Sequence, residues 1–509
     1  MNIHNGAGKW LTFSLSLGAA LAQAKEQPNL LVIITDEHNL RTLGCYRDQL
    51  AQDQAEIWGK DNVVETPNID KLASWGTLFD RMYCSAPVST TARASMFTGY
   101  YGHEVHVPKN STKPGDGRYL RGDVKTIAEV LLDAGYSTGY TGKWHLAEAT
   151  EPHEFWQPHP VGMEGHNYGF EDNRYMFNGG HGKYLGLDKQ GNPYFAFKQP
   201  KAYSTDKYGQ PLYKDKKGDQ VKFTTDFLTD RTVEFIDKNA ENPFFYVVSI
   251  PDPHTPDQVR APYDTMYTHM SFEFPATYNI KMGEDAPSWQ KPDGKAKKLM
   301  TSLPQYFGMV KNIDDNIGRI ITKLENEGIL ENTIIVFTSD HGDLLGEHAR
   351  MNKGTIHETS LRVPFIIAHG SKASKPLVPR DNVVDLVGNT TDWMPTFLEL
   401  LGVDSPQASG RSLVPILSNK APKGWNNVTF SQLGFSVATD GRYKLRVSPY
   451  QEKPWLIDLK EDPTETINFI DDPKYKDVVQ NLAQNLVTYN KEHNKSNEKV
   501  AAVLQSLLQ

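Results

Sequence analysis

Four apolar segments of the chain are each followed by polar residues that a protein core would not select. The residues that follow them are, in chain order, Asp36 and Glu37, Lys143 and His145, His254, and Asp340 and His341. In open α/β sheets, ligands bind beyond the carboxyl ends of the strands. A helix cap or a solvated turn explains any single ending equally well, but four such endings together predict one shared site at the rim of a sheet.

Asp36, Glu37, Asp340 and His341 could together bind a divalent cation. Oxygen-rich ligand sets favour Ca²⁺, Mg²⁺ or Mn²⁺, and a single imidazole does not require zinc. The alternative for the segment that starts at Asp340 is a helix N-terminus, where Asp is a preferred cap. Asp36 directly follows an apolar strand and has no such role, so the sequence favours the cation site.

Ser89 and Arg93 form a second constellation. Ser89 opens a helix-forming run, STTARASMFTG, at the end where free N–H groups and the helix dipole favour an anion. Arg93 lies four residues on, on the same helical face, and could bind that anion or orient a nucleophile. Taken alone, the segment is explained as well by an N-cap serine followed by a surface arginine.

The elements that must position these residues follow an α/β pattern. Short apolar runs alternate with amphipathic segments, which is typical of a mainly parallel sheet between helices. The pattern predicts strands at residues 29–35, 137–140, 244–250 and 333–338. Predicted helices include residues 124–134, 225–238 and 306–327.

Two parts of the chain depart from this pattern. From about 150 to 222 the residues are rich in Gly, aromatic, Lys and Asp side chains, which indicates a long surface insertion without regular structure. We place the catalytic domain at residues 25–410 and a small C-terminal α+β unit at 411–509, with strands at 429–432 and 443–447 and a helix from about 474. No internal repeat is detected.

Residues 1–24 are typical of a secretory signal. Lys9 supplies a positive charge, residues 11–21 an apolar stretch, and residues 22–24 the small-residue cleavage motif AQA. A buried N-terminal helix is the alternative. The apolar stretch is too short to span a membrane, so we expect a periplasmic or secreted protein with no membrane association in its mature form.

Composition excludes several classes of function. The 509 residues include 54 basic and 62 acidic side chains, a net charge of −8 that argues against a nucleic-acid partner. The 2 cysteines, Cys45 and Cys84, cannot build a disulfide scaffold. They could pair with each other, or both remain reduced and buried.

Residues 83–99, YCSAPVSTTARASMFTG, resemble the signature of the formylglycine-dependent sulfatases of the alkaline-phosphatase-like superfamily. The resemblance extends over most of the mature chain. It includes the opening strand with Asp36, residues 141–146 (TGKWHL), 253–256 (PHTP), 338–348 (TSDHGDLLGEH), 353–355 (KGT), and 456–459 (LIDL) with 462–465 (DPTE). It implies an α/β fold with a large, mainly parallel sheet between helices and a smaller C-terminal α+β domain.

The resemblance also implies roles for individual residues. Ser89 would be oxidised to formylglycine (3-oxoalanine) by a cytosolic formylglycine-generating enzyme before export. One hydroxyl of the hydrated aldehyde would attack sulfur, and deprotonation of the other would expel sulfate. Arg93 and Lys143 would hold the hydrate, His145 would act as base, and His254 with Lys353 would bind sulfate and protonate the leaving alcohol. One divalent cation, Ca²⁺ in the first place with Mg²⁺ or Mn²⁺ as alternatives, would be bound by Asp36, Glu37, Ser89, Asp340 and His341.

The chain departs from the family pattern at two positions. Thr91 stands where the modification motif has Pro or Ala, and Glu37 where many relatives carry Asp. An unmodified Ser89 would suit a phosphomonoester or phosphodiester hydrolase, because water can cleave a phosphoserine intermediate. A non-catalytic sulfate- or glycan-binding protein is disfavoured, since binding alone does not need His145, His254 and Lys353 together.

A sulfated carbohydrate is the expected substrate. The export signal and the insertion both favour it, since residues 177–184 (FNGGHGKY) combine aromatic rings with His181 and Lys183, which could contact anionic groups of a polysaccharide. An ordinary Gly-rich surface loop explains the same residues.

Overall fold

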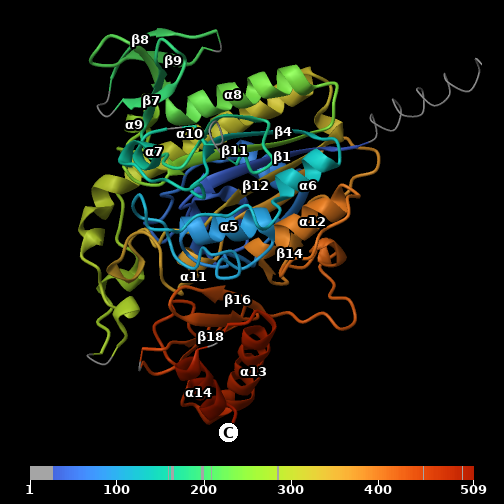
Figure 1. The fold of residues 1–509 in the computed structure, drawn as a ribbon. Helices are drawn as coiled ribbons and strands as arrows, with labels where there is room; N and C mark the ends of the chain where they lie inside the picture. The colour runs from blue at the N-terminus through green and yellow to red at the C-terminus, as the bar shows by residue number, and fades with distance from the viewer. Residues whose placement is uncertain are drawn as a thin grey trace, which may run out of the picture.

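A sheet of eight strands, in the order β14-β2-β13-β12-β1-β11-β4-β5, forms the centre of the computed structural model (Figure 1). The structure describes residues 27–509 except 159, 162–165, 197–199, 208, 284–285, 451 and 496. The predicted signal segment, residues 1–24, lies outside the described residues.

The middle of the sheet is parallel, as predicted. The four strands expected from the apolar runs are present as β1 (Asn29–Asp36), β4 (Ser137–Lys143), β11 (Phe244–Pro253) and β12 (Thr333–Ser339), and β5 (Asp172–Phe177) extends the parallel part beyond β4. On the other side, β13 (Phe365–His369) pairs antiparallel with β12 and with β2 (Gly76–Phe79), and β14 (Asn382–Val384) closes the edge.

Side chains of β1 alternate between two hydrophobic cores. Leu30, Val32 and Ile34 join the core beneath α5 (Ser89–Thr98), α6 (Ile127–Asp133) and α12 (Trp393–Leu400). Leu31 and Ile33 join the core beneath α4 (Pro67–Trp75), α8 (Thr224–Asn239) and α10 (Leu299–Asn326). Figure 1 shows α8 and α10 on one face of the sheet and α5, α6 and α12 on the other. The three helices predicted from the sequence are therefore present, and α10 begins earlier than expected because the chain stays helical through Pro304.

The segment from 150 to 222 is regular, contrary to the sequence-based expectation. It contains α7 (Pro152–Trp156), the main-sheet strand β5, and a five-stranded antiparallel sheet in the order β7-β6-β10-β9-β8. The bounds of these strands are Tyr184–Leu187 (β6), Pro193–Ala196 (β7), Lys201–Thr205 (β8), Pro211–Lys214 (β9) and Gln220–Phe223 (β10). Strands of four or five residues are too short to give a clear period-2 pattern.

A repeated turn connects these short strands. Three segments share the pattern Asp-Lys-x-Gly and begin at Asp188, Asp206 and Asp215. The glycine of each turn is left-handed, with φ of 81°, 75° and 86°, a conformation that glycine adopts without steric cost. The carboxylate of Asp188 accepts the N–H groups of Gln190 and Asn192 at 2.9 and 2.8 Å. The same turn thus recurs three times, and this signal could have revealed the sheet.

The C-terminal unit is an antiparallel sheet covered by two helices. Its strands are β16 (Thr429–Gln432), β17 (Ser436–Thr439), β18 (Tyr443–Val447) and β19 (Trp455–Asp458), of which β16 and β18 match the predicted ranges. α13 (Lys476–Glu492) and α14 (Glu498–Leu507) pack on it around a hydrophobic core of their own. The domain boundary at residues 410–411 stays a prediction.

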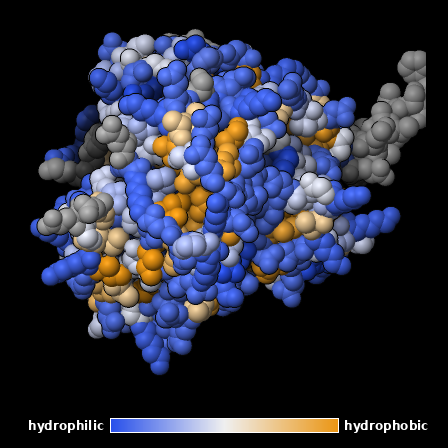
Figure 2. Space-filling model, turned by 90° about the horizontal axis from the view of Figure 1, so that it is seen from below, coloured by the Kyte–Doolittle hydropathy of each residue, from blue (hydrophilic) through white to orange (hydrophobic). Residues whose placement is uncertain are grey.

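The molecular surface is largely hydrophilic. Figure 2, seen from the end where the C-terminal unit lies, shows hydrophobic residues gathered in separate patches between hydrophilic ones. Across the described part of the chain, every helix is too short or too polar to cross a membrane. Cys45 and Cys84 are buried and unpaired, which excludes the disulfide alternative.

We expect the fold to lose stability in acid because His348 is buried uncharged. Burial lowers the pKa of His348 to about 4, against about 6.5 in the unfolded chain. As the pH falls from 6.5 to 4, the unfolded state gains a proton that the folded state does not bind, so stability falls with pH by up to about 3 kcal/mol from this group. Urea unfolding of wild type and His348→Asn at pH 7.5 and pH 4 measures this contribution.

The variant is expected to lose about 3 kcal/mol less than wild type between the two pH values. Asn suits the left-handed backbone of His348, where φ is 55°. His106 is an exposed histidine in the same conformation, with φ of 64°, so His106→Asn is the matched control. Equal pH dependence in all three proteins would contradict the prediction.

Candidate active site

The carboxyl ends of four parallel strands bring their polar residues together. The Lys143 ammonium at the end of β4 donates to Asp36 Oδ2 at the end of β1, at 2.6 Å. Asp340 follows β12, and its Oδ1 accepts the backbone N–H of Glu37 at 3.3 Å. His254 follows β11 and pairs with Glu37 Oε2 at 2.9 Å. The structure thus places the four predicted strand endings at one rim.

Glu37 faces this rim because its backbone leaves the strand conformation. Successive residues of a strand point to opposite faces of the sheet, so a regular strand could not aim both Asp36 and Glu37 at one site. Glu37 has a φ of 60°, in the left-handed region that non-glycine residues rarely adopt. The Tyr306 hydroxyl donates to the Glu37 carbonyl at 2.8 Å and fixes this turn. Backbone strain of this kind is typical of functional sites.

Ser89 is the first residue of α5 and points into the cluster. Its Oγ lies 2.9 Å from His341 Nε2, 3.5 Å from Asp36 Oδ1 and 3.3 Å from Lys143 Nζ. The helix cap is Val88, so Ser89 makes no capping hydrogen bond. The alternative of an N-cap serine is therefore wrong. The helix-start alternative for Asp340 is wrong as well, because a loop follows β12 at that position.

Asp36, Asp340 and His341 fit a divalent cation. Their donor atoms all lie within 4.8 Å of one another, and all three side chains are buried. His341 Nδ1–H donates to the Gly342 carbonyl at 3.1 Å, and burial lowers the pKa of this histidine, so Nε2 is left as an electron-pair donor. Glu37 Oε1 is buried beside this set without any hydrogen-bond partner. The orphaned carboxylate oxygen and the three convergent donors suit a hard cation.

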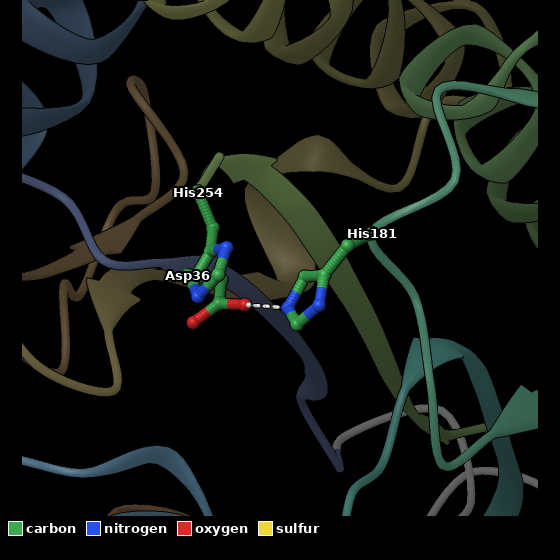
Figure 3. Close-up of side chains that lie close together, drawn as sticks. All are labelled: Asp36, His181 and His254. Atoms are coloured by element: carbon green, nitrogen blue, oxygen red, sulfur yellow. Dashed lines mark hydrogen bonds and ion pairs between the residues drawn. The ribbon is translucent and has the colours of Figure 1, made fainter. Parts of the chain in front are cut away.

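A second group, Asp36 with His181 and His254, lies beside the first (Figure 3). His181 Nε2 is 3.1 Å from Asp36 Oδ2. The two imidazole rings stack with centroids 3.9 Å apart and planes within 9° of parallel. Because the lone pairs of a ring lie in its plane, parallel rings direct their nitrogens side by side and do not converge on one ion. This geometry suits binding of an anion's oxygens better than coordination of a second metal.

Both ring nitrogens of His254 face hydrogen-bond acceptors in this arrangement. Its Nε2 faces Glu37 Oε2 at 2.9 Å, and its Nδ1 faces the Thr255 carbonyl oxygen at 2.7 Å. Both partners only accept hydrogen bonds, so both ring nitrogens must donate. Lys353 donates to the same Glu37 oxygen at 2.9 Å. Burial raises the pKa of Glu37, but His254 and Lys353 outweigh burial and hold that pKa well below its usual value.

His145 is uncharged in this cluster. Its Nε2–H donates to the Ser111 carbonyl at 3.1 Å, and Nδ1 is buried without a partner. Burial, Lys143 and Arg93 all lower the pKa of His145 well below its usual value. A neutral imidazole with an unprotonated Nδ1 can accept a proton.

Arg93 is buried and supports the site through hydrogen bonds. Its Nε donates to Asp340 Oδ2 at 2.8 Å, and Nη1 donates to the Lys143 carbonyl and to Ser249 Oγ at 2.7 and 2.8 Å. Nη2 is buried with no partner. The side chain therefore fixes three strands and keeps one donor group free. The alternative of a surface arginine is wrong.

Comparisons with known proteins identify the family of the chain. A family model described as Sulfatase matches residues 28–403 of the chain. The chain belongs to the sulfatase family. A second model, described as N-sulphoglucosamine sulphohydrolase, C-terminal, matches residues 346–492. The family, the alkaline-phosphatase-like fold and the class of enzyme predicted from the sequence are all confirmed.

Relatives of this sulfatase span nearly its whole length. The N-acetylglucosamine-6-O-sulfatase of Bacteroides thetaiotaomicron is 26% identical over an alignment of 538 residues that covers 94% of this chain and 90% of that protein. The uncharacterized sulfatase YidJ of Escherichia coli is 27% identical, covering 91% of this chain and 87% of that protein. A solved complex of a protein with its substrate D-glucosamine-2-N,6-O-disulfate has a TM-score of 0.71 at 22% identity, covering 93% of this chain and 99% of that chain.

The sulfatase has a cleft of about 480 Å³ beside the cluster. Lys143, His145 and His181 line its inner end. Asn178, from the predicted segment 177–184, also lines the cleft, whereas the sequence did not indicate Phe155, Trp156, Phe195 and Gln258. Trp156 is 53% exposed, an unusual fraction for a large aromatic side chain. The sequence around α7 gives no clear helical pattern, so nothing in the sequence singled out Trp156.

Lys183 is among the residues that line this cleft, but its ammonium group is paired within the protein. It is buried in the sulfatase, and its ammonium donates to Asp252 Oδ1 at 2.6 Å and to the His254 carbonyl at 2.8 Å. Thr225 completes this group by donating to Asp252 Oδ2 at 2.5 Å. The charge of Lys183 is thus paired inside the protein. This pairing favours a role in positioning His254 over direct contact with a substrate anion.

Lys183→Met is expected to lower kcat/KM for a sulfated sugar by about 100-fold, the contribution of one general acid. The loss should be much smaller for 4-nitrophenyl sulfate, because its leaving group departs without a proton. Steady-state kinetics with the two substrates measure the difference. Equal losses on both substrates would contradict a positioning role. The exposed Lys189→Met, in the turn after β6, is the control.

Proposed function

We propose that this sulfatase removes sulfate from a sulfated carbohydrate, with Ser89 converted to formylglycine and one divalent cation, Ca²⁺ in the first place, at Asp36, Asp340, His341 and Glu37. The observation that carries the proposal is the place of Ser89 Oγ, within 2.9–3.5 Å of His341, Lys143 and Asp36. Such a cluster stabilises charge on a transferring sulfuryl group.

A carbohydrate substrate is supported by the cleft and by the relatives. Exposed aromatic rings such as Trp156 pack against the apolar faces of sugars, while polar side chains such as Asn178 and Gln258 can bond to hydroxyls. The relatives named above include an N-acetylglucosamine-6-O-sulfatase and a protein whose substrate is a disulfated glucosamine. His181 would contact the sulfate itself, because its ring stacks on His254 beside Asp36.

The modified Ser89 and the cation would supply the electrophilic and nucleophilic chemistry. The hydrated aldehyde of formylglycine would supply one hydroxyl for attack on sulfur and a second whose deprotonation would release sulfate. A bound divalent cation would act as a Lewis acid toward the oxygens around it. Lys143 and the unpartnered Nη2 of Arg93 would orient the residue at position 89 through hydrogen bonds.

The two histidines would divide the proton transfers. His145 is neutral with a free Nδ1, so it would take a proton at that atom. His254 donates from both nitrogens, so it would give its Nε2 proton to the leaving alcohol, and Lys353 on the same Glu37 oxygen would help to bind the sulfate. Opposite protonation states of two neighbouring residues are what acid–base catalysis at one pH requires.

Export and modification complete the proposal. Formylglycine would be formed by a cytosolic formylglycine-generating enzyme on the unfolded chain, followed by export to the periplasm or the exterior. Thr91 would influence catalysis only at that earlier step, because in the folded protein it does not line the catalytic cleft and its methyl group packs at Gly102.

Thr91→Ala is expected to raise the fraction of chains with formylglycine and to leave the turnover per modified chain unchanged. Alanine restores the residue type that the motif prefers, and it loses no hydrogen bond of the side chain. The mass of the tryptic peptide 82–93, two hydrogens lighter when converted, measures the fraction in protein from the native host. Thr90→Ala, at a position that the motif leaves open, is the control. An unconverted peptide in every sample would overturn the formylglycine mechanism.

The substrate is tested by sulfate release from a panel of defined sulfated mono- and oligosaccharides, with phosphate mono- and diesters as the comparison. Release from sulfated sugars by converted protein is the expected result. Activity on phosphate esters alone, with an intact serine, would favour the phosphoesterase alternative.

A further inference from the structure

A second cavity, of about 160 Å³, lies between the catalytic domain and the C-terminal unit. One wall comes from α5 and the loop after it, through Thr91, Tyr101 and His103. The other comes from the β16–β17 turn and from the end of α13 and the start of α14, through Phe435, Asn490 and Lys495. None of its lining residues also lines the catalytic cleft, so the two are separate.

Polar groups of this cavity lack partners within the protein. Thr91 is 3% exposed, and its Oγ1 has no hydrogen-bond partner. Asn490 Oδ1 is likewise buried and unpartnered. A buried polar atom without a partner costs about 1–3 kcal/mol. A hydroxylated ligand would relieve this cost, since its hydroxyls can donate to Asn490 and both donate to and accept from Thr91.

The charge of the cavity is positive. Lys495 and Lys109 are among its lining side chains, and no acidic residue is. Lys495 forms no ion pair with any residue that the structure describes, and burial lowers the pKa of its ammonium to about 8. The whole chain carries a net charge of −8, so a lysine pair without a carboxylate is a local exception. A partly buried cationic group without a counter-charge favours an anionic ligand.

Apolar surfaces complete the site. Tyr101, Phe435 and Pro449 provide flat surfaces of the kind on which sugar rings pack. The volume suits one small molecule and excludes an oligosaccharide. We propose that this cavity binds an acidic monosaccharide, with Lys495 on its carboxylate or sulfate and Thr91 and Asn490 on its hydroxyls.

Isothermal titration of the full-length protein with D-glucuronate tests the proposal, with methyl glucoside as the uncharged probe. We expect glucuronate to bind at one site and the glucoside to bind at least tenfold more weakly. Lys495→Gln should weaken glucuronate binding tenfold or more, because it removes one member of a charge pair. Lys499→Gln, an exposed lysine on α14, should leave binding unchanged. Sulfatase activity should be the same in all three proteins.

Asn490→Ala provides a second variant, since it removes a hydroxyl acceptor without changing charge. It should weaken glucuronate and glucoside binding by similar factors. Glucuronate binding that persists in Lys495→Gln would place the ligand elsewhere, in the catalytic cleft for example, and would overturn the proposal. Absence of binding to the wild-type protein would overturn it as well.

Discussion

Ser89→Ala is expected to abolish sulfate release, with a fall in kcat of roughly 10⁴-fold or more, because removal of a nucleophile eliminates its whole reaction path. Ala also removes the hydroxyl that lies 2.9 Å from His341 Nε2. The fold should be unaffected, since Ser89 does not cap α5. Sulfate release from a sulfated sugar, followed by ion chromatography, measures the loss.

Ser89→Cys is the matched control. The modification motif accepts either Cys or Ser at this position, so the variant is expected to be converted to the same formylglycine and to keep its activity. The tryptic peptide mass reports the conversion in both variants. An active Ser89→Ala protein would exclude a role of this side chain as nucleophile, whether modified or not.

Asp340→Asn is expected to weaken Ca²⁺ binding by about 100-fold or more and to lower kcat by about 10³-fold. Asparagine keeps the shape of the side chain and can still accept the N–H groups of Glu37 and His341 that Asp340 Oδ1 accepts. It removes the negative charge that faces both the cation site and Arg93, at 2.8 Å. Calorimetric titration with Ca²⁺ and activity assays over the same concentration range measure the two effects.

Loss of the buried Arg93 pair should also reduce the free energy of unfolding, by about 3–5 kcal/mol. Asp458→Asn separates this effect from cation binding. Asp458 is buried and pairs with Arg442 at 2.9 Å in the C-terminal unit. The Asp458→Asn variant should be less stable than wild type and should keep full Ca²⁺ affinity. If Asp340→Asn binds Ca²⁺ as tightly as wild type, the cation lies elsewhere.

The sequence predicts the centre of the fold well, because buried parallel strands give continuous apolar runs. The polar residues at their ends were sufficient to predict a common rim. Glu37 could not be placed in this way, since its direction depends on a left-handed φ that no residue pattern indicates. The five-stranded sheet was missed because its strands are short, although the repeated Asp-Lys-x-Gly turn marks it.

The sequence predicted which residues form the active site better than it predicted the role of each residue. His181 and Lys183 lie two residues apart, yet His181 faces Asp36 and Lys183 is buried against Asp252. Similarly, burial and the charges of Lys143 and Arg93 keep His145 neutral, whereas His254 donates from both ring nitrogens because of the atoms that face them. Some of these contacts join distant segments, such as His181 with Asp36, 145 residues away, and a single sequence does not contain them.

The charges gathered around Ser89 have a consequence for binding equilibria. Three carboxylates, those of Asp36, Glu37 and Asp340, face four cationic groups: Arg93, Lys143, Lys353 and the His254 ring. The carboxylates are thus outnumbered before any cation binds, and a divalent ion adds two further positive charges. Cation and sulfate should therefore bind cooperatively, each tightening the other by the same factor, as thermodynamic linkage requires. Inorganic sulfate would then raise the apparent affinity for Ca²⁺ while it competes with substrate.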